Sequence, residues 1–242
     1  MILQVESLRK TFARRVAVDE VSFTVDAGEV VGVLGPNGAG KTTTMRMIAG
    51  YLEPDGGTAR VFNIDVTKDR RRAQERIGYL PEGAPLYDEM TPLGFLTFLA
   101  EARGLKKDVA RNAVRRAAQD AQLGDSIDRP IAALSKGYRR RVGIASTLLH
   151  DPMLLILDEP TDGLDPNQRQ YVRDLIRRLG TERAVLLSTH SLEEVAAVCT
   201  RAIIINKGRI VADATPQALA EGHSDGLEGA FRSLTTLEEA VS

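Results

Sequence analysis

The chain has 242 residues, of which 43% are hydrophobic, enough for one large core or two modest ones. Its 32 basic and 33 acidic residues leave a formal net charge of −1, which gives no electrostatic reason to expect a nucleic-acid partner. A single cysteine, Cys199, excludes an internal disulfide and is typical of a reducing compartment. The start MILQVESLRK has its charge after its apolar residues, the reverse of a secretory leader, and no apolar run approaches the about 18 residues of a membrane span. We therefore expect a cytoplasmic chain without a transmembrane segment.

The first part of the chain predicts strands around a glycine-rich loop. The predicted strands are ILQVESL, VSFTV and GEVVGVLG, at 2–8, 21–25 and 28–35. A helix closed by Gly50 is expected in KTTTMRMIAG. EPDGGTARVFNIDV, at 53–66, predicts a turn and another strand, and RIGYLPE ends in a loop marked by proline.

The second part of the chain predicts a helical insertion followed by alternating strands and helices. From Thr91 to about Gln122 the apolar residues have helical spacing without any strand signal. The strands MLLILDE and AVLLSTH return on either side of a helix in NQRQYVRDLIRRLG, an alternation that predicts parallel βαβ units. AIIINKGRIVADAT predicts a hairpin with Lys207 and Gly208 at its turn. Cys199 lies in the helical run LEEVAAVCT and is expected to be a packing residue, and GHSDG predicts a loop near the C-terminus.

GPNGAGKT, at 35–42, satisfies the pattern G-x-x-x-x-G-K-[ST] and lies between a predicted strand and a predicted helix, as a phosphate-binding loop requires. Its glycines let backbone N–H groups curl around a β-phosphate, Lys41 reaches the β- and γ-oxygens, and the Thr42 hydroxyl is available to Mg²⁺. The alternative is a glycine-rich turn without a ligand, and the flanking strand and helix argue against it. The residues expected to hold the nucleotide in this segment are Gly35, Pro36, Asn37, Gly38, Ala39, Gly40, Lys41, Thr42 and Thr43.

Two acidic residues end the apolar strand predicted in MLLILDE. Because ligands bind at the C-terminal edge of a parallel sheet, Asp158 is expected to hold Mg²⁺ through water and Glu159 to orient or deprotonate the attacking water. Solvated surface acids or helix caps are the alternative, and the upstream phosphate loop favours function. His190 ends the strand AVLLSTH and is expected to touch the γ-phosphate or fix the water, although a lone histidine is more often structural.

A third segment, LSKGYRRRVGIASTLLHD at 134–151, begins with small and polar residues and continues as an amphipathic helix, which is typical of a helix N-terminus that meets an anion. With GPNGAGKT, LSKGY, LLILDEPTDGLD and STH in this order, the chain closely resembles the nucleotide-binding subunits of ABC transporters over nearly its whole length. In that family two subunits sandwich two ATP molecules. The resemblance therefore implies that Ser135 and the Gly137 backbone meet the γ-phosphate held by the partner, and that Gly163-Leu164-Asp165 crosses the same seam.

The resemblance also assigns Phe12 and Glu82. Phe12 lies where the family places an aromatic on adenine, whereas taken alone it is more typical of a core position. Most family members carry glutamine at Glu82, in the loop that links the γ-phosphate to the membrane subunit. A carboxylate there predicts an additional Mg²⁺ ligand, and the alternative is that it points toward the permease or solvent. Lys136 and Tyr138 depart from the commoner signature LSGGQ, in a way similar to the ATPases of drug, polysaccharide and gliding-motility exporters.

The resemblance implies an α/β fold: a P-loop NTPase core with a mainly parallel sheet, an antiparallel β subdomain and a helical subdomain. The ATPase domain is expected at 1–222, with the helical subdomain inserted at about 83–150, followed by a tail at 223–242. The implied function is that of a Mg²⁺-ATPase, with Lys41, Glu159 and His190 as catalytic residues. It would dimerise on ATP, with itself or a paired subunit, and drive a separate permease, for export, at the inner face of the cell membrane. A soluble ABC ATPase of DNA repair or translation and a regulatory module without turnover are the alternatives.

Overall fold

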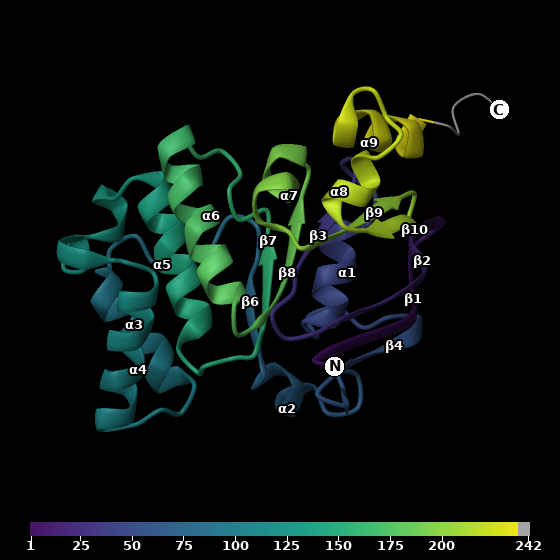
Figure 1. The fold of residues 1–242 in the computed structure, drawn as a ribbon. Helices are drawn as coiled ribbons and strands as arrows, with labels where there is room; N and C mark the ends of the chain where they lie inside the picture. The colour runs from purple at the N-terminus through teal and green to yellow at the C-terminus, as the bar shows by residue number, and fades with distance from the viewer. Residues whose placement is uncertain (237–242) are drawn as a thin grey trace.

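The structure is a computed structural model that describes residues 1–236, so the end of the predicted tail at 223–242 lies outside the described residues. A six-stranded sheet forms its centre, in the order β10-β9-β3-β8-β7-β6 (Figure 1). All neighbouring pairs in this sheet are parallel except the hairpin of β9 and β10, which confirms the predicted parallel units and the predicted hairpin. The strands are β3 (Val30–Leu34), β6 (Ile77–Leu80), β7 (Leu154–Asp158), β8 (Ala184–Thr189), β9 (Arg201–Asn206) and β10 (Arg209–Ala214).

The central strands β3, β7 and β8 are buried along their whole length, because both faces of the sheet are covered. Successive side chains of a strand point to opposite faces. Leu155 of β7 packs in a cluster with helices α5 (Lys136–Leu148) and α6 (Pro166–Gly180). The adjacent Leu154 packs in a second cluster with helix α1 (Lys41–Ile48) and the N-terminal strands. The parallel sheet therefore separates two apolar cores.

A second, antiparallel sheet has the order β2-β1-β4-β5, and α1 lies between it and the central sheet (Figure 1). Its strands are β1 (Leu3–Phe12), β2 (Arg15–Val25), β4 (Gly56–Val61) and β5 (Ile64–Asp65), and the short helix α2 (Arg70–Gln74) follows. The strand predicted within 53–66 is in fact a hairpin. Phe62 and Asn63 both have positive φ, at 50° and 62°, and make the tight turn that divides it.

The helical subdomain lies between β6 and β7 in sequence and to one side of the sheet in space (Figure 1). It contains α3 (Pro92–Ala102), α4 (Lys107–Asp120) and α5, all within the predicted 83–150. Thr91 begins α3, since its Oγ1 accepts a hydrogen bond from the Gly94 N–H at 3.1 Å. Buried alanines form the inner face of α4 and let it pack closely against its neighbours.

The C-terminal part covers the end of the sheet that carries β9. Helix α7 (Leu192–Val198) follows β8, and α8 (Pro216–Ala220) and α9 (Gly226–Thr236) follow β10, with the predicted GHSDG loop between them. Helix α9 was not predicted from the sequence. Its apolar residues pack against a buried cluster of β3, α7 and β9; they are Leu227, Phe231 and Leu234.

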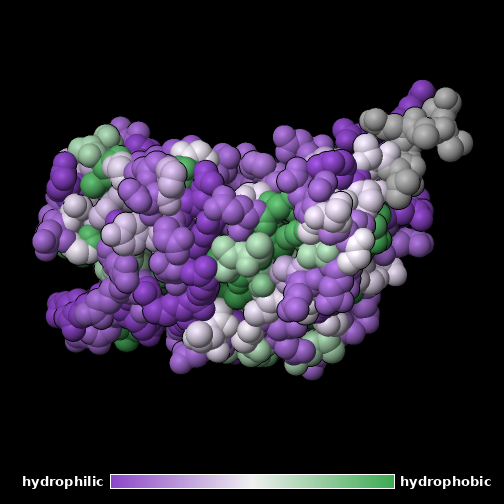
Figure 2. Space-filling model, turned by 45° about the horizontal axis from the view of Figure 1, so that its top comes forward, coloured by the Kyte–Doolittle hydropathy of each residue, from purple (hydrophilic) through white to green (hydrophobic). Residues whose placement is uncertain are grey.

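Cys199 packs between two of these clusters, as predicted, and burial raises the pKa of its thiol. None of the helices within residues 1–236 has the length and apolar character needed to cross a lipid bilayer. On the face drawn in Figure 2 the helical subdomain is largely hydrophilic, and hydrophobic residues gather toward the centre of the face.

His150 gives the folded chain a pH dependence. Its Nε2 lies 2.9 Å from the carbonyl oxygen of Ile77. Burial lowers its pKa from 6.5 to about 4, with help from the nearby Arg103 cation and against the Ile77 contact and Asp151. The unfolded chain therefore takes up the proton first as pH falls, and stability decreases between these two values.

We expect His150→Gln to remove this pH dependence, because the amide still donates to Ile77 and does not titrate. Between about pH 7 and about pH 5, the original chain should lose about 2 kcal/mol more unfolding free energy than the variant. Denaturant titrations at both pH values measure the two losses. Equal losses would contradict the assignment to His150.

Candidate active site

The glycine-rich loop connects β3 to α1 at the C-terminal edge of the central sheet. Two of its glycines have no room for a Cβ: one on Gly35 would collide with the carbonyl oxygen of Ile205, and one on Gly40 with that of Ala17. Gly40 also has a φ of 109°, a conformation open mainly to glycine. A tight loop that leads into a helix N-terminus forms a concave site for an anion.

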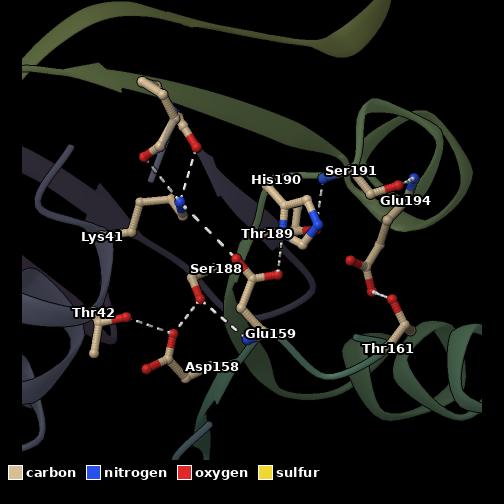
Figure 3. Close-up of polar contacts among 12 residues, drawn as sticks. Lys41, Thr42, Asp158, Glu159, Thr161, Ser188, Thr189, His190, Ser191 and Glu194 are labelled. Carbon is tan, nitrogen blue, oxygen red and sulfur yellow. Dashed lines mark hydrogen bonds and ion pairs between the residues drawn. The ribbon is translucent and has the colours of Figure 1, made fainter. Parts of the chain in front are cut away.

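Lys41 is the first residue of α1 and is only 7% exposed. Its Nζ donates to the carbonyl oxygens of Gly35 at 2.8 Å and Pro36 at 3.3 Å, and it lies 3.9 Å from Oε1 of Glu159 (Figure 3). Burial lowers the pKa of the ammonium, and the neighbouring carboxylates oppose that change. The cation therefore rests on neutral carbonyl groups, which a phosphate can outcompete.

Asp158 ends β7 and is completely buried. Its Oδ1 accepts hydrogen bonds from the hydroxyls of Thr42, at 3.2 Å, and Ser188 (Figure 3). The other oxygen, Oδ2, is buried and has no hydrogen-bond partner among residues 1–236. An unpaired buried carboxylate oxygen beside a hydroxyl is the kind of donor pair that a hard cation uses.

Glu159 follows directly and has a φ of 47°, which is uncommon for a residue with a side chain. Its carboxylate points back toward the loop, with Oε2 3.0 Å from Nδ1 of His190 (Figure 3). Burial raises the pKa of Glu159, and the contacts with His190 and Lys41 oppose this. A partly buried carboxylate with a raised pKa is suited to accept a proton near neutral pH.

A cavity of about 790 Å³, a size typical of small-molecule sites, is lined by Lys41 and Glu159, whereas the buried Asp158 is not among its lining residues. Phe12 lines it and is 48% exposed, so the alternative that Phe12 belongs to the core is wrong. The exposed Glu82 lines it as well. The other predicted residues at its wall are Asn37, Gly38, Gly40, Lys41, Thr42, Thr43, Glu159 and His190.

The LSKGY segment does not line this cavity. The Ser135 hydroxyl accepts a hydrogen bond from the Tyr138 N–H at 3.2 Å and caps α5. The Gly137 N–H donates to Oε1 of Gln168, on α6, at 3.1 Å. Gly163 has a φ of 62°, a conformation that favours glycine, and the flexible end of the Lys136 side chain occupies the position where a Cβ would lie. The two predicted phosphate sites of one chain are therefore separate in space.

Sequence reasoning missed Ser188, Gln168 and Glu194. Ser188 was open to detection, because the ends of MLLILDE and AVLLSTH pair in parallel register and place it beside Asp158. Gln168 and Glu194 carry no local signal, since their partners come from distant segments.

Comparisons with known proteins agree with this arrangement. Residues 18–162 match the ABC transporter family. Nod factor export ATP-binding protein I of Ralstonia nicotianae is 38% identical over 219 residues, which cover 90% of this chain and 68% of that protein. The ABC transporter ATP-binding protein NatA of Bacillus subtilis is 38% identical over 220 residues, which cover 90% of this chain and 89% of that protein.

Solved structures agree as well. The ATP binding subunit of an ABC transporter superposes with a TM-score of 0.84 and 28% identity over 97% of this chain and 99% of that one. The cbiO1 protein of Clostridium perfringens, part of the ABC transporter complex cbiONQ, superposes with a TM-score of 0.79 and is 28% identical over 90% of each chain. The expected P-loop NTPase fold is confirmed, and none of these proteins is named for DNA repair or translation. The chain belongs to the ABC transporter family, as an ATP-binding subunit whose hydrolysis of ATP powers transport.

Proposed function

We propose that two ATPase subunits, either two copies of this chain or one copy and a paired subunit, sandwich two ATP molecules. Each nucleotide lies between the glycine-rich loop of one subunit and the LSKGY segment of the other. The observation that carries this proposal is the position of Ser135 and Gly137 at the N-terminus of α5, outside the cavity of their own chain. A helix N-terminus attracts phosphate oxygens, and a second subunit is needed to bring one to the cavity.

The nucleotide is held by the loop residues Gly35–Thr43, with the adenine against the exposed ring of Phe12. Lys41 exchanges the carbonyl oxygens of Gly35 and Pro36 for the β- and γ-phosphate oxygens, because a charge-assisted hydrogen bond is stronger than a neutral one.

Mg²⁺ belongs to this proposal too. Thr42 and Asp158 suit it, since a hydroxyl lies beside a buried carboxylate whose Oδ2 has no partner among the described residues. Within residues 1–236 no three acidic, histidine or cysteine side chains form a metal cluster, and Mg²⁺ commonly takes phosphate oxygens as its remaining ligands. Bound there, the ion neutralises phosphate charge. Glu82, at the wall of the same cavity, is the third proposed ligand.

Glu159 accepts a proton from the attacking water, and His190 orients the carboxylate through the 3.0 Å contact with Oε2. Burial favours the neutral form of Glu159, so the carboxylate is basic enough to take the proton. The Lys41 ammonium, 3.9 Å from Oε1, favours the ionised form of Glu159 and so opposes the effect of burial on its pKa.

A groove for the permease is proposed at a second cavity of about 590 Å³, where the loop after β6 meets the helical subdomain. Tyr51 and Tyr87 line it and are 66% and 54% exposed. Glu82 is five positions before Tyr87, so the same loop joins the nucleotide cavity to this groove. A permease segment seated there places the subunit at the cytoplasmic face of the membrane, and the names of the Nod factor relatives support export.

We expect Glu159→Gln to bind ATP but to lose hydrolysis, because the amide has the same size and cannot accept the proton. Turnover should fall by about a hundredfold or more. Phosphate release and nucleotide affinity are measured on the same preparation. Glu89→Gln, an exposed acid outside this cavity, is the control. Release close to that of the original chain would refute the assignment.

Mixing two defective chains tests the shared site in a homodimer. Lys41→Ala removes the cation of the loop. Ser135→Asp sets a negative charge against the partner's γ-phosphate and still caps α5, because Asp and Ser are both good N-caps. Each variant alone should lose hydrolysis, and the mixture should regain about a quarter of the original activity, since half of the dimers are mixed and each holds one intact site.

Ser135→Asn is the matched control, since it caps the helix without the charge. Gly137 is unsuitable for this test: a Cβ there would lie 2.7 Å from the Gln168 side chain of the same chain. If mixed dimers form and hydrolyse no faster than the sum of the two variants, the shared arrangement is wrong.

Glu82→Gln tests the third metal ligand. Replacing a charged ligand by a neutral one should raise the Mg²⁺ concentration for half-maximal hydrolysis by about threefold to tenfold. Nucleotide binding in EDTA should stay equal or become tighter, because the carboxylate no longer repels the γ-phosphate. The Mg²⁺ titration is run at saturating ATP. Superimposable curves in both assays would remove Glu82 from the metal site.

A further inference from the structure

Glu194 is a buried acid that the proposed mechanism does not use. It is the third residue of α7 and is 1% exposed, whereas its neighbour Glu193 is 67% exposed and pairs with two arginines at the surface. The side chain of Glu194 enters the protein beside the catalytic edge of the sheet (Figure 3). A buried carboxyl group is unfavourable unless other groups hold it, so its contacts indicate what it does.

The first contact is with the segment that follows Glu159. The hydroxyl of Thr161, 5% exposed, donates to Oε1 of Glu194 at 2.9 Å (Figure 3). Thr161 is separated from Glu159 by Pro160 alone, and proline has a fixed φ and restricts the backbone of the residue before it. A bond that holds Thr161 therefore also restricts Glu159, whose φ of 47° needs support from its surroundings.

The second contact is with the segment that carries His190. The backbone N–H of Glu194 donates to Oγ of Ser191, the residue after His190, at 3.3 Å, and burial raises the pKa of the Glu194 carboxyl group. Thr189 immediately precedes His190, and its Oγ1 also accepts a hydrogen bond from the Ser191 N–H at 3.0 Å (Figure 3). Glu194 thus bonds through its carboxyl group to the segment after Glu159 and through its backbone N–H to the residue after His190.

We propose that Glu194 is a positioning residue for ATP hydrolysis: its buried carboxyl group holds the segment after Glu159, its backbone N–H bonds to Ser191 beside His190, and together they fix the contact between Glu159 and His190. The inference rests on the proposed roles of Glu159 and His190. Ser188 connects the same segments at the sheet, where it accepts a hydrogen bond from the Glu159 N–H at 3.1 Å. Glu194 adds a connection beyond the strand ends, where the strands no longer hydrogen-bond to each other.

A residue that only stabilises the fold and one that positions the catalytic pair differ in what they change. Loss of positioning lowers kcat and leaves nucleotide affinity intact, because Lys41 and the loop remain in place. It also makes His190 less important, since a misplaced histidine contributes little. Burial favours the neutral form of the Glu194 carboxyl group, so glutamine is its close substitute, with an oxygen for Thr161.

The experiment uses the full chain with ATP for turnover and a non-hydrolysable ATP analogue for affinity. Glu194→Met fills the space without polar atoms and should lower kcat by about tenfold or more, while affinity changes by less than about twofold. In Glu194→Gln, kcat should fall by less than about threefold. Thr161→Val removes only the hydroxyl and should fall between these two. Thr147→Val, an equally buried threonine on α5 whose hydroxyl bonds to Ile144, is the matched control and should keep the original kcat.

His190→Ala supplies the decisive readout. It should lower kcat by a smaller factor in the Thr161→Val and Glu194→Met chains than in the original chain, because the three residues act as one unit. The proposal is overturned if Glu194→Met and Thr161→Val keep the original kcat, if affinity falls in step with kcat, or if the His190→Ala effect is the same in all chains. If Glu194→Met fails to fold, the same measurements on Thr161→Val test the proposal.

Glu159→Gln, measured in parallel, separates this inference from the proposed function. Continued hydrolysis by that variant would contradict Glu159 as proton acceptor, whatever Glu194 does. Loss of hydrolysis in Glu159→Gln together with full activity in Thr161→Val would keep the proposed mechanism and overturn the role of Glu194.

Discussion

The arrangement of the site depends on how one buried carboxylate, that of Asp158, is held. Asp158 has no exposure to solvent, and such a group is tolerated only when hydrogen bonds compensate for lost hydration. Thr42 of α1 and Ser188 of β8 supply those bonds. One side chain therefore connects a helix and two strands that lie far apart in sequence. A shift of the start of α1 against the sheet would break the Thr42 hydrogen bond and leave the buried carboxylate with Ser188 as its remaining donor among the described residues.

The catalytic residues lie directly beyond the edge that Asp158 fixes. Lys41 begins the helix that Thr42 anchors, and Glu159 follows Asp158 along the chain. His190 follows the strand that Ser188 anchors. The three groups reach one another through contacts of 3.0 and 3.9 Å, although the chain between them includes a whole helical subdomain.

The sequence predicted best the features whose signal is local. The strands β3, β7 and β8 read as unbroken apolar runs because both faces are buried, and the acid and histidine at their ends identified the ligand edge. Features set by tertiary contacts were missed. The apolar residues of α9 acquire a role only against β9, and Gln168 bonds to Gly137 across 31 positions. Nothing in the pair Glu193 and Glu194 shows that one faces solvent and the other the interior.

The hydrogen bond between the Gly137 N–H and Gln168 bears on how reversible the proposed dimer is. In the single subunit this donor is already satisfied, so an arriving phosphate replaces one partner with another rather than filling a vacant position. The net gain is the difference between a charged and a neutral acceptor, which is about 1 kcal/mol instead of the full strength of either bond. An exchange with so small a surplus is easily reversed once the γ-phosphate is gone. In the proposed dimer, Gln168 would compete with the phosphate for the Gly137 N–H and so would favour separation of the two subunits after each turnover.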